Sequence, residues 1–228
     1  MKQDILVWDF PTRVFHWSLV GSFAGAMISA DSKSFLLTHI VFGYLLLGLV
    51  GFRLMWGVVG SRYARFSEFV RGPGAIAGHL YSLLRGSPAS HVGHNPAGAL
   101  AILGLLALGA TVAATGLATF YGIAGKAMEE FHEGVSYGML ALAVAHVVGV
   151  LVTSALLREN LILAMLTGRK PGPSEKSARQ SHGIVAILLL LAIGGFAWAL
   201  ARGQLPSLID PATLSSKMSR DHHHENHH

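Results

Sequence analysis

The chain alternates long apolar runs with short polar segments. Five runs approach the roughly 20 apolar residues that an α-helix needs to cross the hydrocarbon core of a bilayer. They cover residues 14–30, 35–58, 97–121, 131–156 and 183–201. A sixth run, residues 160–167, is too short to span, and we expect it to lie at the interface or to end the fourth helix. The pattern predicts an all-α membrane protein with five transmembrane helices.

Composition agrees with a membrane location. Hydrophobic residues make up 52% of the 228 residues and charged residues only 13%, whereas soluble domains carry about 25% charged residues. The chain has no cysteine, which excludes disulfides, thiolate metal sites, iron–sulfur clusters and covalently attached c-type haem. The first residues lack the apolar core and cleavage site of a signal peptide, so we expect the first apolar run to be retained. Any redox chemistry must therefore use a bound cofactor.

Basic residues indicate which way the helices run. Five of them fall on one side of the predicted spans, and the other 12 of the 17 Lys and Arg residues fall on the opposite side. The five are Lys33, Lys126, Arg202, Lys217 and Arg220. Because basic loops stay in the cytoplasm, we expect a cytoplasmic N-terminus in the bacterial inner membrane and a periplasmic C-terminus. The basic residues lie in short loops between apolar runs that are expected to be surrounded by membrane lipid. This placement does not indicate nucleic-acid binding.

Four histidines fall within or at the ends of predicted spans, where an ionisable side chain is costly and is a functional candidate. They are His16, His39, His132 and His146. The last two share one face of the fourth helix and lie about 21 Å apart along its axis. The direction of each span places His39 with His132 at the outer depth and His16 with His146 at the inner depth. One such His is equally well explained by a hydrogen bond between helices, but two depth-matched pairs indicate bis-imidazole ligation of two b-type haems.

Two arginines lie near the inner pair. Arg13 is one turn before His16, and Arg53 is at the inner end of the second span. A guanidinium group binds a carboxylate through two parallel hydrogen bonds, so we expect both arginines to bind the propionates of the inner haem. A charge that merely sets the membrane topology explains Arg53 almost as well.

Zinc is the second cofactor that these His pairs could hold, with Glu133 assisting at the outer depth. It normally takes three or four protein ligands, which neither pair supplies alone. His79, His91 and His182 are expected to be solvated loop residues. The His-rich tail over residues 222–228 could bind a divalent metal.

His94 is a further candidate at the inner surface. It precedes Asn95 and Pro96, which are typical of a helix start. At that depth it could replace His16 as an inner haem ligand. It could instead relay protons to a quinone headgroup.

Several segments resemble the prokaryotic cytochrome b561 family. They are VWDFPTRVFHW at residues 7–17, HNPAGA at 94–99, the spaced pair His132 and His146, and REN at 158–160 followed by TGRK at 167–170. This family is similar to the di-haem cytochrome b subunits of nickel–iron hydrogenase and formate dehydrogenase. The resemblance implies a four-helix bundle with two b haems, His ligands on the first, second and fourth helices, and exchange of electrons with quinone.

These observations predict three parts: a di-haem bundle over residues 1–180, a fifth transmembrane helix over 181–201 and an extracytoplasmic tail over 202–228. We expect electron transfer between the quinone pool and a redox partner such as a c-type cytochrome or a dehydrogenase. No nucleotide or flavin motif appears in the loops, so an internal NAD(P)H or FAD donor is not expected. The alternative function is a non-redox membrane metal transporter that uses the histidines and the tail.

Overall fold

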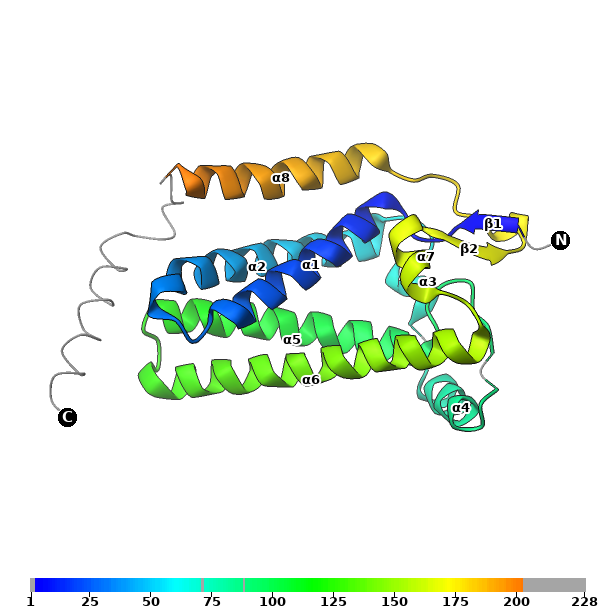
Figure 1. The fold of residues 1–228 in the computed structure, drawn as a ribbon, viewed down its shortest axis with the longest axis horizontal. Coiled ribbons are helices and arrows are strands. Elements are labelled where there is room, and N and C mark those ends of the chain that lie inside the picture. Colours follow the sequence, from blue (N-terminus) through cyan, green and yellow to red (C-terminus); the bar gives the residue numbers. More distant parts are fainter. Residues whose placement is uncertain (1–2, 71, 88, 203–228) are drawn as a thin grey trace, which may run out of the picture.

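Five long helices dominate the computed structural model, which describes residues 3–70, 72–87 and 89–202. They are α1 (Phe10–Ser29), α2 (Leu36–Val59), α5 (Pro96–Phe120), α6 (Gly125–Leu157) and α8 (Gly183–Ala201). Each overlaps one of the five apolar runs, although α1 and α6 begin before the predicted starts, at Phe10 and Gly125. Figure 1 shows α1, α2, α5 and α6 as a bundle with α8 laid along one side. The predicted tail beyond residue 202, with its histidines, lies outside the described residues.

Short elements gather at one end of the bundle, which we call the strand end (Figure 1). They are β1 (Gln3–Leu6), α3 (Phe66–Phe69), α4 (Pro73–Leu84), α7 (Leu161–Thr167), β2 (Arg169–Gly172) and a 3₁₀ turn (Ser174–Lys176). We call the opposite end the turn end, because the α1–α2 and α5–α6 connections lie there. A second 3₁₀ turn (Lys33–Phe35) precedes α2 at the turn end.

Backbone pairing ties the first residues of the chain to the segment after α7. Strands β1 and β2 are antiparallel, with Leu6 opposite Arg169. The N–H groups of Val7 and Trp8 both donate to the carbonyl of Gly168, at 2.8 and 3.1 Å. Gly168 has a φ of +80°, and a Cβ there would collide with the Trp8 carbonyl oxygen. Glycine is therefore required at this junction.

Three helices among the described residues are long and apolar enough to cross a membrane: α2, α5 and α6. The apolar part of α8, Gly183–Ala199, is shorter, and α1 carries Arg13 in its first turn. Many large apolar side chains point outward, including Val58, Val144 and Leu191. In a bilayer such side chains face lipid rather than water. The predicted all-α membrane protein is confirmed, and spanning by α1 and α8 stays a prediction.

Helix packing follows two antiparallel pairs. α1 packs along α2, α5 packs along α6, α2 also contacts α5, and α8 rests on α1. In the middle of the bundle, buried side chains from all four core helices meet: Phe23, Leu46, Val112 and Met139. This apolar cluster separates the two ends of the bundle, where the polar groups are found.

The short apolar run over residues 160–167 forms a helix of its own. α6 ends at Leu157 because Arg158 takes a left-handed conformation with a φ of 53°. Asn160 then caps α7, its side-chain oxygen accepting from Leu163 N at 2.8 Å. The run therefore does not form the end of the fourth helix, and its place at the membrane interface stays a prediction.

Asp9 fixes the start of α1. The residue is 1% exposed, and its carboxylate accepts hydrogen bonds from Thr12 N at 2.9 Å and Trp56 Nε1 at 3.0 Å. The first bond caps α1, and the second joins α1 to α2. Pro11 adds a backbone angle already suited to a first helical turn.

We expect Asp9→Ala to lower the free energy of unfolding by about 2–4 kcal/mol, because the cap is lost and the buried Trp56 N–H loses its acceptor. Thermal unfolding of the purified protein in detergent measures the change. Asp4→Ala, which alters an exposed carboxylate in β1, is the matched control. Equal melting temperatures for the two variants would contradict the anchoring role.

Candidate functional site

At the turn end, two of the predicted histidines face each other. His39 lies in the first turn of α2 and His132 in the second turn of α6. Their ring centroids are 6.1 Å apart and their planes are almost perpendicular, at 87°. His39 Nδ1 lies 2.9 Å from the Ala26 carbonyl oxygen, and His132 Nδ1 lies 3.0 Å from Thr115 Oγ1. Each ring is thus oriented by a bond at its Nδ1.

These partners also decide which ring nitrogen carries the proton. The Ala26 carbonyl can only accept, so His39 Nδ1 must be the donor. The Thr115 hydroxyl donates its own hydrogen to the Thr111 carbonyl at 2.8 Å, which leaves it to accept from His132 Nδ1. Both Nε2 atoms therefore keep a lone pair. An Nδ1–H bonded to an acceptor, with Nε2 left for the metal, is the usual arrangement of a metal-ligating histidine.

The spacing of the two rings suits one metal ion between them. A metal–imidazole bond of about 2 Å on each side puts opposed ring centroids about 6 Å apart. α5 makes room for this geometry at Gly116, where a Cβ would lie 3.0 Å from His132 Cε1. The donors and their spacing fit the bis-imidazole ligation of a haem.

At the strand end, the structure brings together His16 from α1, His146 from α6, His94 before α5 and Arg53 from α2. His146 is close enough to His16 to act on it electrostatically, and His94 is close to all three of the others. His16 and His94 each bury an Nδ1 atom that has no hydrogen-bond partner. The inner depth predicted from the sequence thus holds a pair of span histidines with a third imidazole beside it.

His94 is enclosed by aromatic rings. Its centroid lies 4.4 Å from that of Trp8 and 4.6 Å from that of Phe69. Asn95 caps α5 as the sequence predicts, accepting from Gly98 N at 2.6 Å. Burial, reinforced by the positive charge of Arg53, lowers the pKa of His94 to about 3. The imidazole is therefore neutral at physiological pH, and a charged, proton-carrying form is strongly disfavoured.

The two arginines occupy different surroundings. Arg53 is 2% exposed, lies over the rings of Phe66 and Phe69 at 5.0 and 5.9 Å, and buries an Nη1 atom without a partner. A buried cation needs an anion nearby, and the Asp9 carboxylate is close enough to act on Arg53 electrostatically. The unpartnered Nη1 still suits a carboxylate of a bound group. Arg13 instead donates from Nη1 to the Leu166 carbonyl at 2.6 Å, near the carboxyl end of α7.

One of the remaining histidines was placed wrongly by the sequence, and a second, in the loop before α8, makes contacts that the sequence did not predict. His79 is not a solvated loop residue: it lies in α4, is 5% exposed and faces His91 with ring centroids 5.4 Å apart. Burial and then His91 lower its pKa. His182 precedes α8, and its ring meets the edge of Trp56 at 5.3 Å. Its Nδ1 lies 3.9 Å from Asp9 Oδ2.

Four residues of structural importance were missed from the sequence. Asp9 and Trp56 form the anchor of α1, and the order Asp-Phe-Pro before an apolar run was an available signal for the cap. Thr115 and Gly116 position His132 from α5. No sequence signal identifies them, because their role depends on which face α5 turns toward α6.

The arrangement of these residues gives little support to a zinc site. Within residues 3–70, 72–87 and 89–202, no group of three or more His, Asp or Glu side chains is placed to hold a metal ion. Glu133 is exposed and does not complete an outer site. Paired imidazoles suit an ion whose other positions are filled by a macrocycle better than a tetrahedral zinc ion.

Comparison with known proteins adds one finding. A family model described as prokaryotic cytochrome b561 matches residues 7–168, from the segment before α1 to the end of α7. No curated protein and no solved structure shows a significant match. The four bundle helices and all the candidate ligands lie inside the matched range, whereas α8 lies beyond it.

We expect the His94 imidazole to remain neutral between about pH 5 and pH 8, since its lowered pKa lies below that range. Nitrogen-15 NMR of ring-labelled protein in the reduced, diamagnetic state measures this, and His94→Gln assigns the signal. Ring nitrogen shifts that stay constant across the range are the expected result. A titration midpoint near the ordinary histidine value would contradict the enclosure of this ring.

Proposed function

The chain belongs to the prokaryotic cytochrome b561 family, whose members are membrane proteins that transfer electrons through haem b, and on that premise we propose that it holds two b haems. His39 and His132 would ligate the haem at the turn end, and His16 and His146 the haem at the strand end. The observation that carries this proposal is the 6.1 Å spacing of the first pair. Bound haem b supplies a reversible one-electron couple between ferric and ferrous iron.

The protein's own residues would set the properties of this redox couple and keep other reactants away from it. Two imidazoles would hold each haem, an arrangement that would suit electron transfer rather than oxygen chemistry. Thr115 and the Ala26 carbonyl hold the outer ligands in one tautomer. Arg53 would bind a propionate of the strand-end haem. Arg13 would contribute less than the sequence suggests, because a carbonyl of α7 already takes one of its donors.

We further propose that the protein exchanges electrons with the quinone pool and with a redox partner, either a c-type cytochrome or a dehydrogenase. Haems held by two imidazoles each would exchange electrons with a diffusing carrier or a docked protein, and quinone is a carrier dissolved in the same membrane. A quinone contact at His94 stays a prediction. In its neutral form that imidazole offers a hydrogen bond rather than a stored proton.

For the placement in the membrane, we propose the bacterial inner membrane with the strand end in the cytoplasm. The 12-to-5 division of basic residues supports this orientation. The haem bundle then covers residues 1–180, and 181–201 adds a fifth crossing that carries the tail over 202–228 to the periplasm.

We expect about two haems per chain, one for each pair of imidazoles. Pyridine haemochrome quantitation measures the number, and a value near zero or near one in fully loaded protein contradicts the two-site assignment. His39→Ala and His132→Ala should remove the same haem signal and leave the other. His91→Ala, outside the spans, is the control that should keep both signals. Loss of different signals in the first two variants would show that these residues do not share an iron.

The topology has its own test. A reporter that is active only in the periplasm should be active when it is fused after Ser216, and inactive when it is fused after Ser87 in the loop before α5. Activity of a cytoplasm-only reporter after Ser216 would mean that one of the five helices does not cross the membrane.

A further inference from the structure

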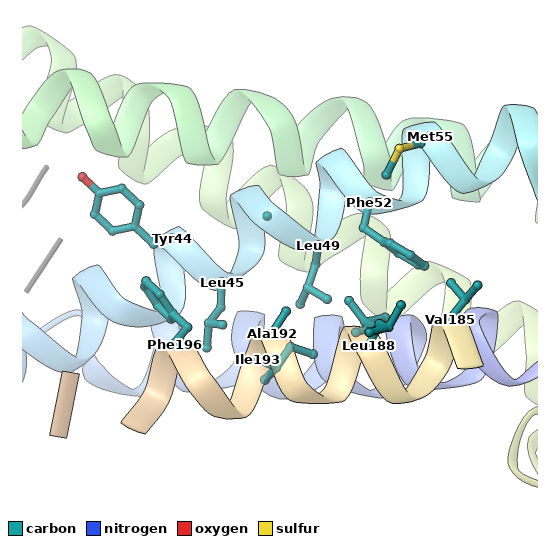
Figure 2. A pocket seen from close by; sticks show the side chains of 12 residues that line it. Tyr44, Leu45, Leu49, Phe52, Met55, Val185, Leu188, Ala192, Ile193 and Phe196 are labelled. Carbon is teal, nitrogen blue, oxygen red and sulfur yellow. The ribbon is translucent and has the colours of Figure 1, made fainter. Parts of the chain in front are cut away.

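α8 borders an apolar groove on its α2 side and a smaller cleft on its α1 side. Figure 2 shows the side chains of α2 and α8 that line the groove, whose volume is about 460 Å³. No lining residue of the groove is charged, and the hydroxyl of Tyr44, its one polar side chain, is already hydrogen-bonded to Tyr121. Nothing in that lining selects one occupant.

The cleft differs from the groove because a cation lines it. It lies where α1, α7 and α8 meet and has a volume of about 300 Å³. The residues that matter here are four of α1 and one each of α7 and α8: Arg13, Val14, Trp17, Ser18, Leu166 and Leu190. No candidate haem ligand lines the cleft, and no lining residue is acidic. The cleft is thus separate from the candidate haem sites and has one charged group, the Arg13 guanidinium.

Arg13 is held in place by the backbone and by an aromatic ring. Its Nη1 donates to the Leu166 carbonyl at 2.6 Å, and its guanidinium carbon lies 4.5 Å from the centre of the Phe10 ring. Its Nε lies against Gly168, where an added Cβ would come within 3.2 Å of it. A guanidinium group has five N–H donors. The bond to Leu166 therefore leaves donors at the terminal nitrogens for a ligand in the cleft.

The charge of Arg13 has no carboxylate partner of its own. Within the residues that the structure describes, no Asp or Glu side chain forms an ion pair with it. Asp9 is close enough to act on it electrostatically, but the Asp9 carboxylate is already bonded to Thr12 N and Trp56 Nε1. Arg13 lies in the first turn of α1, where a membrane-crossing α1 would meet the lipid headgroups. An anion from the surrounding bilayer would complete the charge balance.

Two neutral donors lie near Arg13 along α1. Trp17 carries an indole N–H and Ser18 a hydroxyl, and both line the cleft. Ser18 lies about 7–8 Å beyond Arg13 along the helix axis, which is deeper in the bilayer if α1 crosses it. A phospholipid carries its anionic phosphate at the surface and its ester carbonyls, which can only accept hydrogen bonds, at greater depth. The donors of α1 follow the same order, and Val14 and Leu190 add apolar walls for an acyl chain.

We propose that this cleft binds an anionic phospholipid, with the phosphate at Arg13, an ester carbonyl near Ser18 and an acyl chain against Val14 and Leu190. Basic pockets between transmembrane helices bind anionic lipid headgroups in this way. A quinone has no anionic group and would leave Arg13 uncompensated, and free phosphate would not use the apolar walls. The assignment does not depend on the two proposed haems, because none of their ligands lines the cleft. It gives Arg13 a different anion from the haem propionate that the sequence suggests.

Native mass spectrometry of the purified, haem-loaded protein in detergent tests the assignment, with phosphatidylglycerol and phosphatidylcholine of equal chain length as probes. The protein should retain phosphatidylglycerol, and should retain phosphatidylcholine at least about fivefold less, as one cationic contact implies. Arg13→Gln should lower phosphatidylglycerol retention by about the same factor. Arg85→Gln removes the same charge from an exposed arginine that does not line the cleft, and should retain the lipid as the wild type does. Both variants should keep the wild-type haem spectrum.

A second pair of variants approaches the cleft from α8, in case Arg13→Gln does not fold. Leu190→Trp fills the cleft and should lower retention, whereas Leu191→Trp, at a neighbouring residue that is 66% exposed and does not line the cleft, should not. Equal retention of the two lipids, or equal losses in Arg13→Gln and Arg85→Gln, overturns the assignment, as does retention unaffected by Arg13→Gln or Leu190→Trp. An altered haem spectrum in Arg13→Gln with unchanged retention returns Arg13 to a propionate and also overturns it. Inorganic phosphate that competes as strongly as phosphatidylglycerol shows an anion site without a lipid chain, with the same consequence.

Discussion

The buried carboxylate of Asp9 joins three helices at the strand end. It caps α1 through Thr12 N, accepts from the indole of Trp56 in α2 and lies 3.9 Å from the imidazole of His182, which precedes α8. Between helices in a membrane there is little hydrophobic driving force, because lipid chains are as apolar as the side chains. A polar anchor then has a large influence on how the helices align. His16 lies on α1 two turns from this anchor, so the depth and direction of that ligand depend on it.

Unpaired buried polar atoms are concentrated at the same end. Most buried polar groups in proteins have partners, and the two histidines at the turn end follow that rule through Ala26 and Thr115. At the strand end, His16 Nδ1, His94 Nδ1 and Arg53 Nη1 have none. The contrast distinguishes two kinds of site. At the turn end, the two histidines are oriented by the protein alone. At the strand end, the unpaired donors would suit the carboxylates of a haem.

α8 lies beyond the residues that the family model matches. It changes the surface of the bundle more than its interior. α8 is apolar around its whole circumference, so composition gives it no preferred face. Its position follows from contacts at its start, where Phe10 N bonds the Ser181 carbonyl and His182 meets Trp56. Held there and resting on α1, it leaves its α2 side open. The apolar groove of about 460 Å³ between α8 and α2 is thus a consequence of these contacts at the start of α8.

The sequence by itself determined the five long helices and the pairing of the four span histidines by depth, but not the earlier starts of α1 and α6 or the short helices α3 and α4. Those features depend on local quantities: the length of each apolar run, capping residues such as Asn95, and a fixed rise per residue. Only the tertiary structure decided that His94 joins His16 and His146, that Arg53 is buried while Arg13 binds α7, and that His79 is enclosed. The physical reason is that these outcomes depend on the rotation of each helix about its axis. A helix that is apolar on every side has no preferred face. Its rotation is set by packing and cannot be predicted from the sequence.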